Sequence, residues 1–315
     1  MRQSYRLTDG TLRPCTDDAA PLQLCIAPEA EELEWLRSRF GLDAHALASA
    51  LDPDEVARVE FRAGSLFLIW KRPENYSGGE RFAFEVSSFG MLLDERQLVL
   101  ISNADSLLGG LAGRHDLHQP LDVLLAILLG NIHHYEGHLK VIKLVARELQ
   151  QRFNQSQHNR HLLQMLGLSE SLVYYLNAIH GNGAVLARLR SQGERLGFPP
   201  ASLELLDDLI IENDQCIKQA EIYSTVLAGL MEARGSLLNT TMNEMLRKLT
   251  LINVVFLPLN LIAGIGGMSE FSMMTAAIPW WLSYPLFVLA LAVLAGLMLL
   301  ALRRLVAARA SPPAS

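Results

Sequence analysis

Two uncharged stretches near the C-terminal end of the chain constrain its fold more than any other feature. Residues 249–269 and 271–302 contain no Asp, Glu, Lys or Arg, and only Glu270 separates them. About 20 apolar residues in a helix cross the hydrocarbon of a bilayer, and both Leu249–Met268 and Ile278–Leu302 reach that length. The alternative is a pair of buried helices in a soluble core. We expect two transmembrane helices behind a larger soluble part.

Charged and aromatic residues at the ends of these spans predict their orientation. Basic residues flank the pair of spans on the sides away from the connecting loop, namely Arg247, Lys248, Arg303, Arg304 and Arg309. The loop itself has no Lys or Arg. By the positive-inside rule both termini are cytoplasmic. Trp280, Trp281 and Tyr284 open the second span, as in an aromatic belt at the outer interface. The protein is therefore expected in the cytoplasmic (inner) membrane.

The charge of the soluble part limits its partners. Residues 1–245 hold 22 basic and 32 acidic side chains, a net charge of −10. Such a domain repels the phosphates of nucleic acid, which we exclude as a partner, and it suits a protein that handles cations. The sequence has no glycine-rich phosphate loop with a lysine and no arrangement typical of nucleophilic catalysis. We expect neither an enzyme nor a catalytic cofactor.

Short strands and helices alternate in the first third of the chain. Strand composition occurs in Leu22–Ile26, Arg58–Arg62, Leu66–Trp70, Phe82–Ser87 and Gln97–Ser102, with a Ser77-Gly78-Gly79 turn. Glu29–Phe40 and Asp43–Leu51 are typical of helices. From Pro120 onward the pattern is entirely helical, over 120–155, 160–196 and 201 to the membrane. No proline interrupts the last helix between 200 and 258, so one long rod is expected to enter the bilayer.

These patterns predict an α+β cytoplasmic head with a long helical stalk, followed by an all-α transmembrane hairpin. The expected divisions are 1–118 for the α/β head, 119–245 for the helical pair and stalk, 246–268 for the first transmembrane helix, 269–277 for the outer loop, 278–302 for the second transmembrane helix and 303–315 for the basic tail.

The first span carries a polar stripe at regular spacing. Its members recur at alternating steps of three and four residues, which is the seam spacing of a coiled coil: Asn243, Leu246, Thr250, Asn253, Leu257, Asn260 and Gly264. A dry two-helix seam is normally apolar, whereas this one is half Asn and Thr. If several copies of the first span surrounded a water-filled pore, these amides could bond to water or to a hydrated ion. The alternative is a polar seam that joins two helices.

The segments Asn243–Thr250 and Phe256–Ser269 resemble the CorA family of divalent-cation transporters, as does the order of parts along the chain. The resemblance implies a homopentameric funnel whose first spans line the pore. It also implies an outer filter at a Gly-Met-Asn motif that holds a hydrated magnesium ion. In this sequence the motif falls on Gly267, Met268 and Ser269.

The sequence departs from the family at the filter. Ser269 stands in the place of the Asn, Gly266 replaces an aromatic residue, and Asn260 replaces a threonine. Glu270 would add a ring of carboxylates at the outer mouth. The zinc-transporting ZntB branch also departs at this motif, but it changes the Met and not the Asn. The sequence resembles a CmaX-like branch.

The expected function is a homo-oligomeric channel or transporter in the lipid bilayer that moves divalent cations, above all magnesium. One alternative is a route for zinc or another transition metal, proton-coupled or not. Another is a non-conducting membrane sensor of cytosolic cations.

Two further groups of residues are candidates for binding metal. The family resemblance implies regulatory magnesium between subunits. The candidates are Asp207, Asp208 and Glu232, of which Asp208 and Glu232 fit by their spacing from the filter. A solvated charged face of the helix is the commoner explanation for such residues. Histidines concentrate between residues 115 and 161. His134 and His138 are an i, i+4 pair that could bind zinc, but no Cys or carboxylate completes a site, so solvated or packed histidines are the favoured interpretation. The others are His115, His118, His133, His158 and His161.

Overall fold

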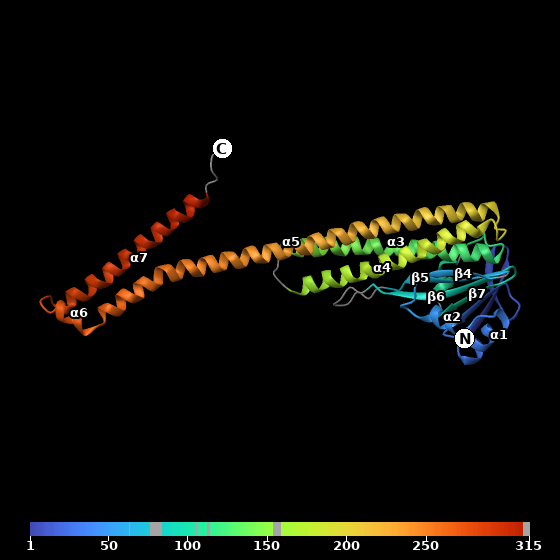
Figure 1. Cartoon of the computed structure of the whole chain (residues 1–315), viewed down its shortest axis with the longest axis horizontal. Helices are drawn as coiled ribbons and strands as arrows, with labels where there is room; N and C mark the ends of the chain where they lie inside the picture. The colour runs from blue at the N-terminus through green and yellow to red at the C-terminus, as the bar shows by residue number, and fades with distance from the viewer. Residues whose placement is uncertain (63, 76–83, 105, 112–113, 154–158, 311–315) are drawn as a thin grey trace, which may run out of the picture. The chain divides into compact units, whose positions relative to one another are not determined.

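The chain packs as two compact units. The computed structural model describes residues 1–62, 64–75, 84–104, 106–111, 114–153 and 159–310. The N-terminal unit is Met1–Met231 and the C-terminal unit is Glu232–Ser315. The strands lie before residue 103 and the long helices begin at Pro120 (Figure 1). The N-terminal unit holds the sheet and the first two long helices, while the third long helix continues into the C-terminal unit.

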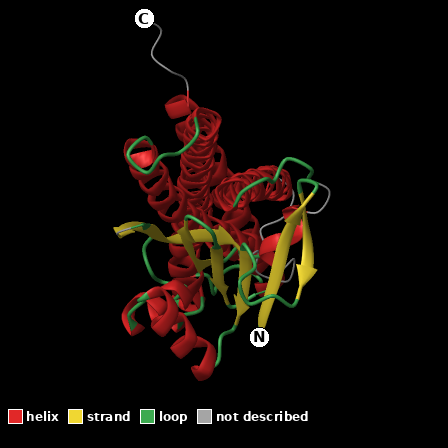
Figure 2. Ribbon diagram, turned by 90° about the vertical axis from the view of Figure 1, so that its right-hand side faces the viewer, coloured by secondary structure: helices red, strands yellow, loops and turns green. Residues whose placement is uncertain are grey.

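A seven-stranded mixed sheet is the centre of the N-terminal unit (Figure 2). Its spatial order is β2-β1-β3-β7-β6-β5-β4. Every neighbouring pair is antiparallel except β3 and β7, which run parallel. The strands are β1 (Arg2–Thr8), β2 (Thr11–Cys15), β3 (Leu22–Ile26), β4 (Arg58–Arg62), β5 (Ser65–Pro73), β6 (Val86–Asp94) and β7 (Leu98–Ser102).

Helices cover both faces of this sheet. Side chains of a strand alternate between its faces, and on β5 Phe67 and Ile69 enter one core while Leu68 and Trp70 enter the other. The helices α1 (Ala30–Phe40) and α2 (Ala44–Leu51) pack on the first face. The second face packs against α3 (Pro120–Phe153) and α4 (Asn159–Gly193). The first part of α5 (Pro200–Gly266) contributes buried residues to the same core.

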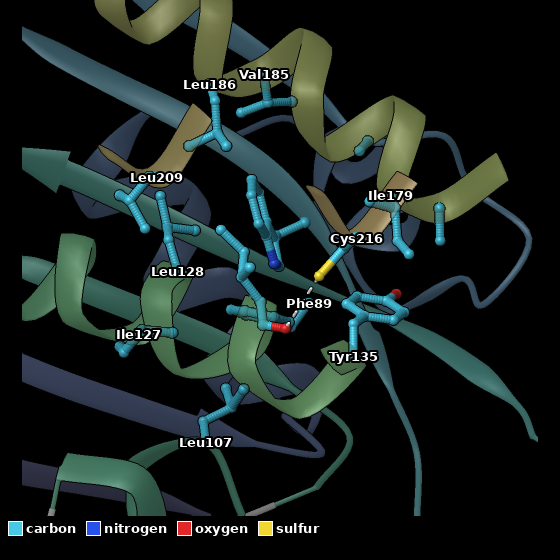
Figure 3. Packing of buried hydrophobic residues seen from close by; sticks show 14 of the residues in the cluster. Phe89, Leu107, Ile127, Leu128, Tyr135, Ile179, Val185, Leu186, Leu209 and Cys216 are labelled. Atoms are coloured by element: carbon cyan, nitrogen blue, oxygen red, sulfur yellow. Dashed lines mark hydrogen bonds between the residues drawn. The ribbon is translucent and has the colours of Figure 1, made fainter. Parts of the chain in front are cut away.

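Three long helices meet in the core on the second face (Figure 3). Tyr135 of α3, Ile179 of α4 and Cys216 of α5 are all buried there. Asn213 of α5 donates its side-chain N–H to the carbonyl of Ile179, with 3.1 Å between the atoms. A Cβ on Gly183 would lie 2.9 Å from that amide nitrogen, so a glycine is what lets α4 and α5 approach there.

One buried amide ties α4 to the sheet. Asn182 donates to the carbonyl of Lys71 (2.8 Å) and accepts from its backbone N–H (3.0 Å). The ladder between β4 and β5 stops at Ile69, so the side chain satisfies a backbone edge that β4 does not reach. The α5 helix on the other side of α4 is thereby linked to the sheet through two asparagines.

The C-terminal unit contains the end of α5, the short α6 (Ser269–Met274) and α7 (Trp280–Ala310). The uninterrupted long rod is confirmed, since α5 runs 67 residues with Pro258 inside it. Two expectations need correction. The outer segment is not all loop, because α6 lies within 269–277. The second helix does not end before the basic tail, since the helix-favouring run from Leu302 to Ala310 continues α7.

Two strand predictions were incomplete. The β1–β2 hairpin was missed because its strands are polar, although Asp9 and Gly10 form its turn with φ of 51° and 71°, as Asp-Gly hairpin turns require. The strand expected at Phe82–Ser87 is β6, which runs over Val86–Asp94 and is buried on both faces, without an alternating pattern. Phe82 and the Ser77-Gly78-Gly79 turn lie outside the described residues.

Candidate functional site

The two apolar spans are not part of a protein core. In the described part of the chain, α5 and α7 are the helices long and apolar enough to cross a bilayer. Only 6 % of the apolar window on α5 is buried, and 0 % of that on α7. Buried helices of a soluble protein would be enclosed by other elements. That alternative is therefore wrong, and the apolar side chains face surroundings that the single chain does not supply.

One face of the membrane part of α5 packs against α7. Val255 is 8 % exposed, the lowest value in this part of the helix. The half-buried residues around it on α5 are Leu251, Pro258, Leu259, Ile262 and Gly266. Those on α7 are Ser283, Phe287, Leu291, Leu294, Ala295 and Met298. Steps of three and four residues on both helices make this a helix–helix seam.

The polar stripe lies on the other face of α5. At about 100° of rotation per residue, the stripe is centred roughly 180° from the seam with α7. All seven residues are exposed in the chain, with Leu257 at 72 %. The members are Asn243, Leu246, Thr250, Asn253, Leu257, Asn260 and Gly264. The second span of the same chain therefore leaves the whole stripe uncovered.

The chemistry of the stripe favours groups that donate hydrogen bonds. The Thr250 hydroxyl donates to the carbonyl of Leu246, with 2.8 Å between the oxygens. Its proton is therefore used within the helix, and the remaining lone pairs of Oγ1 point outward as acceptors. The amide oxygens of Asn253 and Asn260 are also acceptors. Water molecules around a cation turn their hydrogens outward, so a hydrated cation is the complementary guest.

The helix α5 ends in a tight turn at the segment where the sequence resemblance predicts the filter. The N–H of Gly267 donates to the carbonyls of Ala263 (3.1 Å) and Gly264 (3.2 Å), and that of Met268 donates to Ile265 (3.1 Å). The next residue, Ser269, begins α6. Gly267, Met268 and Ser269 are exposed, whereas the side chain of Glu270 lies outside the described part.

The proposed regulatory carboxylates are not gathered in one chain. Asp207 accepts from the guanidinium of Arg190, with 2.9 Å between Nε and Oδ1. Asp208 is exposed on the same helix. Glu232 is also exposed but belongs to the C-terminal unit. A metal site built from these residues would need ligands from another copy.

The histidine pair His134 and His138 is packed among aromatic rings. The Nδ1 atom of His138 lies 2.6 Å from the hydroxyl of Tyr175, and its ring stacks on that tyrosine. Burial, and then the neighbouring His134, lower the pKa of His138 to about 4. Burial also lowers the pKa of the half-buried His134, whose ring packs edge-on against that of His138.

The other histidines are dispersed. His133 lies 3.0 Å from a carboxylate oxygen of Glu212 and links α3 to α5. His115 and His118 are exposed. Within the residues that the structure describes, no group of three or more His, Cys, Asp or Glu side chains is arranged to hold a metal ion. The side chains of His158 and His161 lie outside the described part.

Reasoning from the sequence missed Phe287. Its ring lies against Gly266 at the end of α5, where a Cβ would be 2.3 Å from Cζ of the ring. The glycine in place of an aromatic residue was the available signal. The uniformly apolar second span gave no sign of which of its residues would face it.

An α+β unit whose last helix becomes the first of two exposed apolar spans, with a polar stripe along that span, defines a two-span membrane transport protein. The family model for the CorA-like Mg²⁺ transporter protein matches residues 25–304, and the chain belongs to this family. It is thus an integral membrane protein with two C-terminal helices and a member of a transporter family of divalent cations, not an enzyme.

Similar proteins agree with this assignment. The cobalt/magnesium transport protein CorA of Methanocaldococcus jannaschii is 24 % identical over 253 residues, which is 78 % of each chain. The complete structure of the CorA magnesium transporter from that organism has a TM-score of 0.78 at 21 % identity and covers 96 % of this chain and 98 % of its own. The full-length CmaX protein has a TM-score of 0.73 at 17 % identity, with 96 % of both chains covered. At these identities the structures establish the fold.

Proposed function

We propose that five copies of this chain assemble around their α5 helices into a channel for hydrated magnesium. The observation that carries the proposal is the uncovered polar stripe opposite the seam with α7. An asparagine in hydrocarbon is costly unless it faces protein or water. A ring of copies turns every stripe toward one aqueous axis, while α7 lies outside and contacts lipid. The number five comes from the family resemblance.

Magnesium is the proposed cargo because the stripe presents acceptors to an intact hydration shell. Mg²⁺ sheds its water reluctantly, so a pore that bonds to shell water suits it. The M. jannaschii relative named above is a cobalt/magnesium transport protein, which supports the same choice. In this proposal the Gly267 carbonyls and Ser269 hydroxyls form the outer filter, and Glu270 concentrates cations at the mouth through its field. Asp208 and Glu232 remain proposed regulatory ligands between copies.

The proposed orientation places both termini in the cytosol. Support comes from Arg247, Lys248 and the arginines after the second span, which flank the spans, while the segment between the spans has no basic residue. Protease accessibility of a C-terminal tag in sealed inverted vesicles tests this orientation. A tag protected in inverted vesicles would contradict it.

The assembly is tested by cysteine placement in the full chain, with Cys15, Cys25 and Cys216 replaced by serine. Asn253→Cys should react with a charged, water-soluble thiol reagent in liposomes and cross-link between copies. Ile252→Cys is the matched control, because Ile252 is exposed on α5 but lies off the stripe. Equal reactivity at the two positions, or a monomer in detergent, would overturn the proposed pore.

The filter is tested by Ser269→Asn and Ser269→Ala. The amide should raise flux of magnesium relative to cobalt and nickel and strengthen block by hexamminecobalt, a mimic of hydrated magnesium, while alanine should weaken that block. If neither variant changes selectivity or block in a conducting protein, the filter lies elsewhere. If the wild-type protein moves no divalent cation into liposomes, the cation-sensor alternative becomes the better account.

A further inference from the structure

An aromatic ring from α7 fills the space beside Gly266 at the end of α5. A Cβ on Gly266 would lie 2.3 Å from Cζ, 2.7 Å from Cε1 and 3.1 Å from Cε2 of Phe287. Side-chain carbons do not approach so closely, so even alanine cannot share this space with the ring. The φ angle of Gly266 is not positive. The glycine is therefore needed to admit the ring and not to permit an unusual backbone.

The neighbouring glycines differ from Gly266 in this respect. A Cβ on Gly264 would meet nothing within 4 Å, and one on Gly267 would meet only backbone carbonyls at 3.6 and 3.7 Å. Of these three glycines, only Gly266 has the space at its Cβ position occupied by a side chain of the second span. The contact is thus specific to one position, at the last residue of α5.

This position is next to the turn that begins the proposed filter. Gly266 is followed directly by Gly267, whose N–H closes the end of the helix onto Ala263 and Gly264. Phe287 lies on the seam of α7, one turn after Ser283. A phenyl ring is bulky and has two torsion angles, so it sets a fixed separation between two helices. The ring consequently fixes how far the filter turn lies from α7.

We propose that Phe287 is a positioning residue for the filter: its ring, seated on Gly266, sets the separation of the Ser269 side chains around the axis and thereby the size of hydrated ion that they accept. The proposal rests on the channel and filter proposed above. Serine hydroxyls have a short reach, so their separation depends on the backbone behind them. Magnesium demands near-ideal geometry whereas calcium tolerates a flexible one, so a loosened ring of hydroxyls should lose discrimination against calcium first.

The experiment compares magnesium and calcium flux into liposomes for variants of the full-length protein. Phe287→Ala and the milder Phe287→Leu remove or shrink the ring, and Gly266→Ala adds a methyl that overlaps it. Each should lower the magnesium-to-calcium flux ratio, by about tenfold for the two alanine variants, since a site loosened on the scale of 1 Å loses its selectivity. The double variant Gly266→Ala with Phe287→Leu should recover part of the ratio, because the smaller side chain makes room for the methyl.

Two matched controls distinguish loss of the contact between Phe287 and Gly266 from general destabilisation of the two transmembrane helices. Gly296→Ala adds a methyl on α7 where nothing lies within 4 Å. Leu289→Ala shortens an exposed side chain of the same helix. Both should keep the wild-type flux ratio. Cross-linking through Asn253→Cys, added to each variant, reports whether the assembly persists.

The outcomes distinguish failure of the positioning role of Phe287 from failure of the proposed filter. If Ser269→Ala alters the flux ratio while the variants at 266 and 287 do not, the proposed filter is supported and the proposed positioning role of Phe287 is wrong. If none of them alters the ratio, the filter itself is wrong. If every variant at 266 and 287 fails to assemble while the controls assemble, the contact holds the hairpin together and does not tune selectivity, which also overturns the inference.

Discussion

The two units of the chain use leucine in opposite ways. Leu100 in β7 is 0 % exposed, while Leu289 in α7 is 61 % exposed. The first is enclosed by the sheet and its helices, and the second is largely exposed in its own chain. The core of the N-terminal unit is thus closed by residues of that unit. The C-terminal unit depends on lipid and, in our proposal, on other copies of itself.

Asparagines show the same contrast. Asn182 is buried, and both its donor and its acceptor are bonded to Lys71. Asn253 is exposed on an apolar span, where the same chain leaves its side chain uncovered. One amide is satisfied by its own chain, and the other must be satisfied by water, an ion or a neighbour. For these asparagines, the difference between the units is therefore where the hydrogen-bonding partners come from.

The largest expected effect sharpens the contrast between the leucines. Leu100→Ala should lower the free energy of unfolding of the N-terminal unit by about 3–4 kcal/mol, because it leaves a cavity in a closed core. Leu289→Ala should change it by less than about 0.5 kcal/mol. Urea unfolding of the full chain in detergent, followed by circular dichroism, measures both. Equal losses would mean that α7 is enclosed in a way the single chain does not reveal.

A somewhat smaller effect is expected from the asparagines. Asn182→Leu leaves the backbone N–H and carbonyl of Lys71 without partners and should cost about 2–3 kcal/mol in the same assay. Asn253→Leu should leave the unfolding of the N-terminal unit unchanged and instead reduce magnesium flux. If Asn253→Leu conducts normally, the polar stripe does not line a pore.

Acid should weaken the N-terminal unit through His138. In the unfolded chain a histidine has a pKa near 6.5, whereas the folded protein holds this pKa at about 4. The unfolded state therefore binds the proton first, and stability falls as the pH drops from 6.5 toward 4. We expect a loss of about 1–2 kcal/mol, which His138→Gln should remove. His45→Gln, at an exposed position on α2, is the control, and an unchanged acid response in His138→Gln would assign the effect elsewhere.

The smallest expected effect concerns an apolar ring in the polar stripe. Leu246 and Leu257 would form dewetting constrictions in the proposed pore. Leu257→Ala should raise magnesium flux about two- to fivefold, equivalent to about 0.4–1 kcal/mol on a barrier. Liposome flux normalised to the amount of assembled protein checks this. Unchanged or lower flux would move the constriction to another position.

Local patterns were sufficient for much of the fold. The predicted ranges of β3 and β4 agree with the structure, and the lack of proline between 200 and 258 predicted the continuous α5. The β1–β2 hairpin was missed because polar edge strands carry no apolar alternation, even where an Asp-Gly turn joins them. Strand β6 was misplaced because its centre contains Gly90, a residue type depleted in strands, so composition did not extend the predicted range beyond Ser87.

The candidate site was partly predictable for the same reason. Polar residues in an apolar span are conspicuous, so their spacing identified the stripe and its single face. The contact between Gly266 and Phe287 could not be derived, since it depends on the rotation of α7 about its own axis. A span made only of apolar residues carries no periodic signal for that rotation.

The pairing of β3 with β7 bears on how the protein is made. The two strands at the centre of the sheet are residues 22–26 and 98–102, and the core around them also requires Leu227 of α5. The first uncharged span begins at residue 249. At about 5–20 residues per second, a ribosome reaches that span roughly one to four seconds after it has added the last core residue. In a variant whose β3–β7 pairing forms slowly, the membrane spans would therefore be synthesised before the N-terminal unit has folded. Such a variant should give little membrane-inserted protein even where the folded protein is stable.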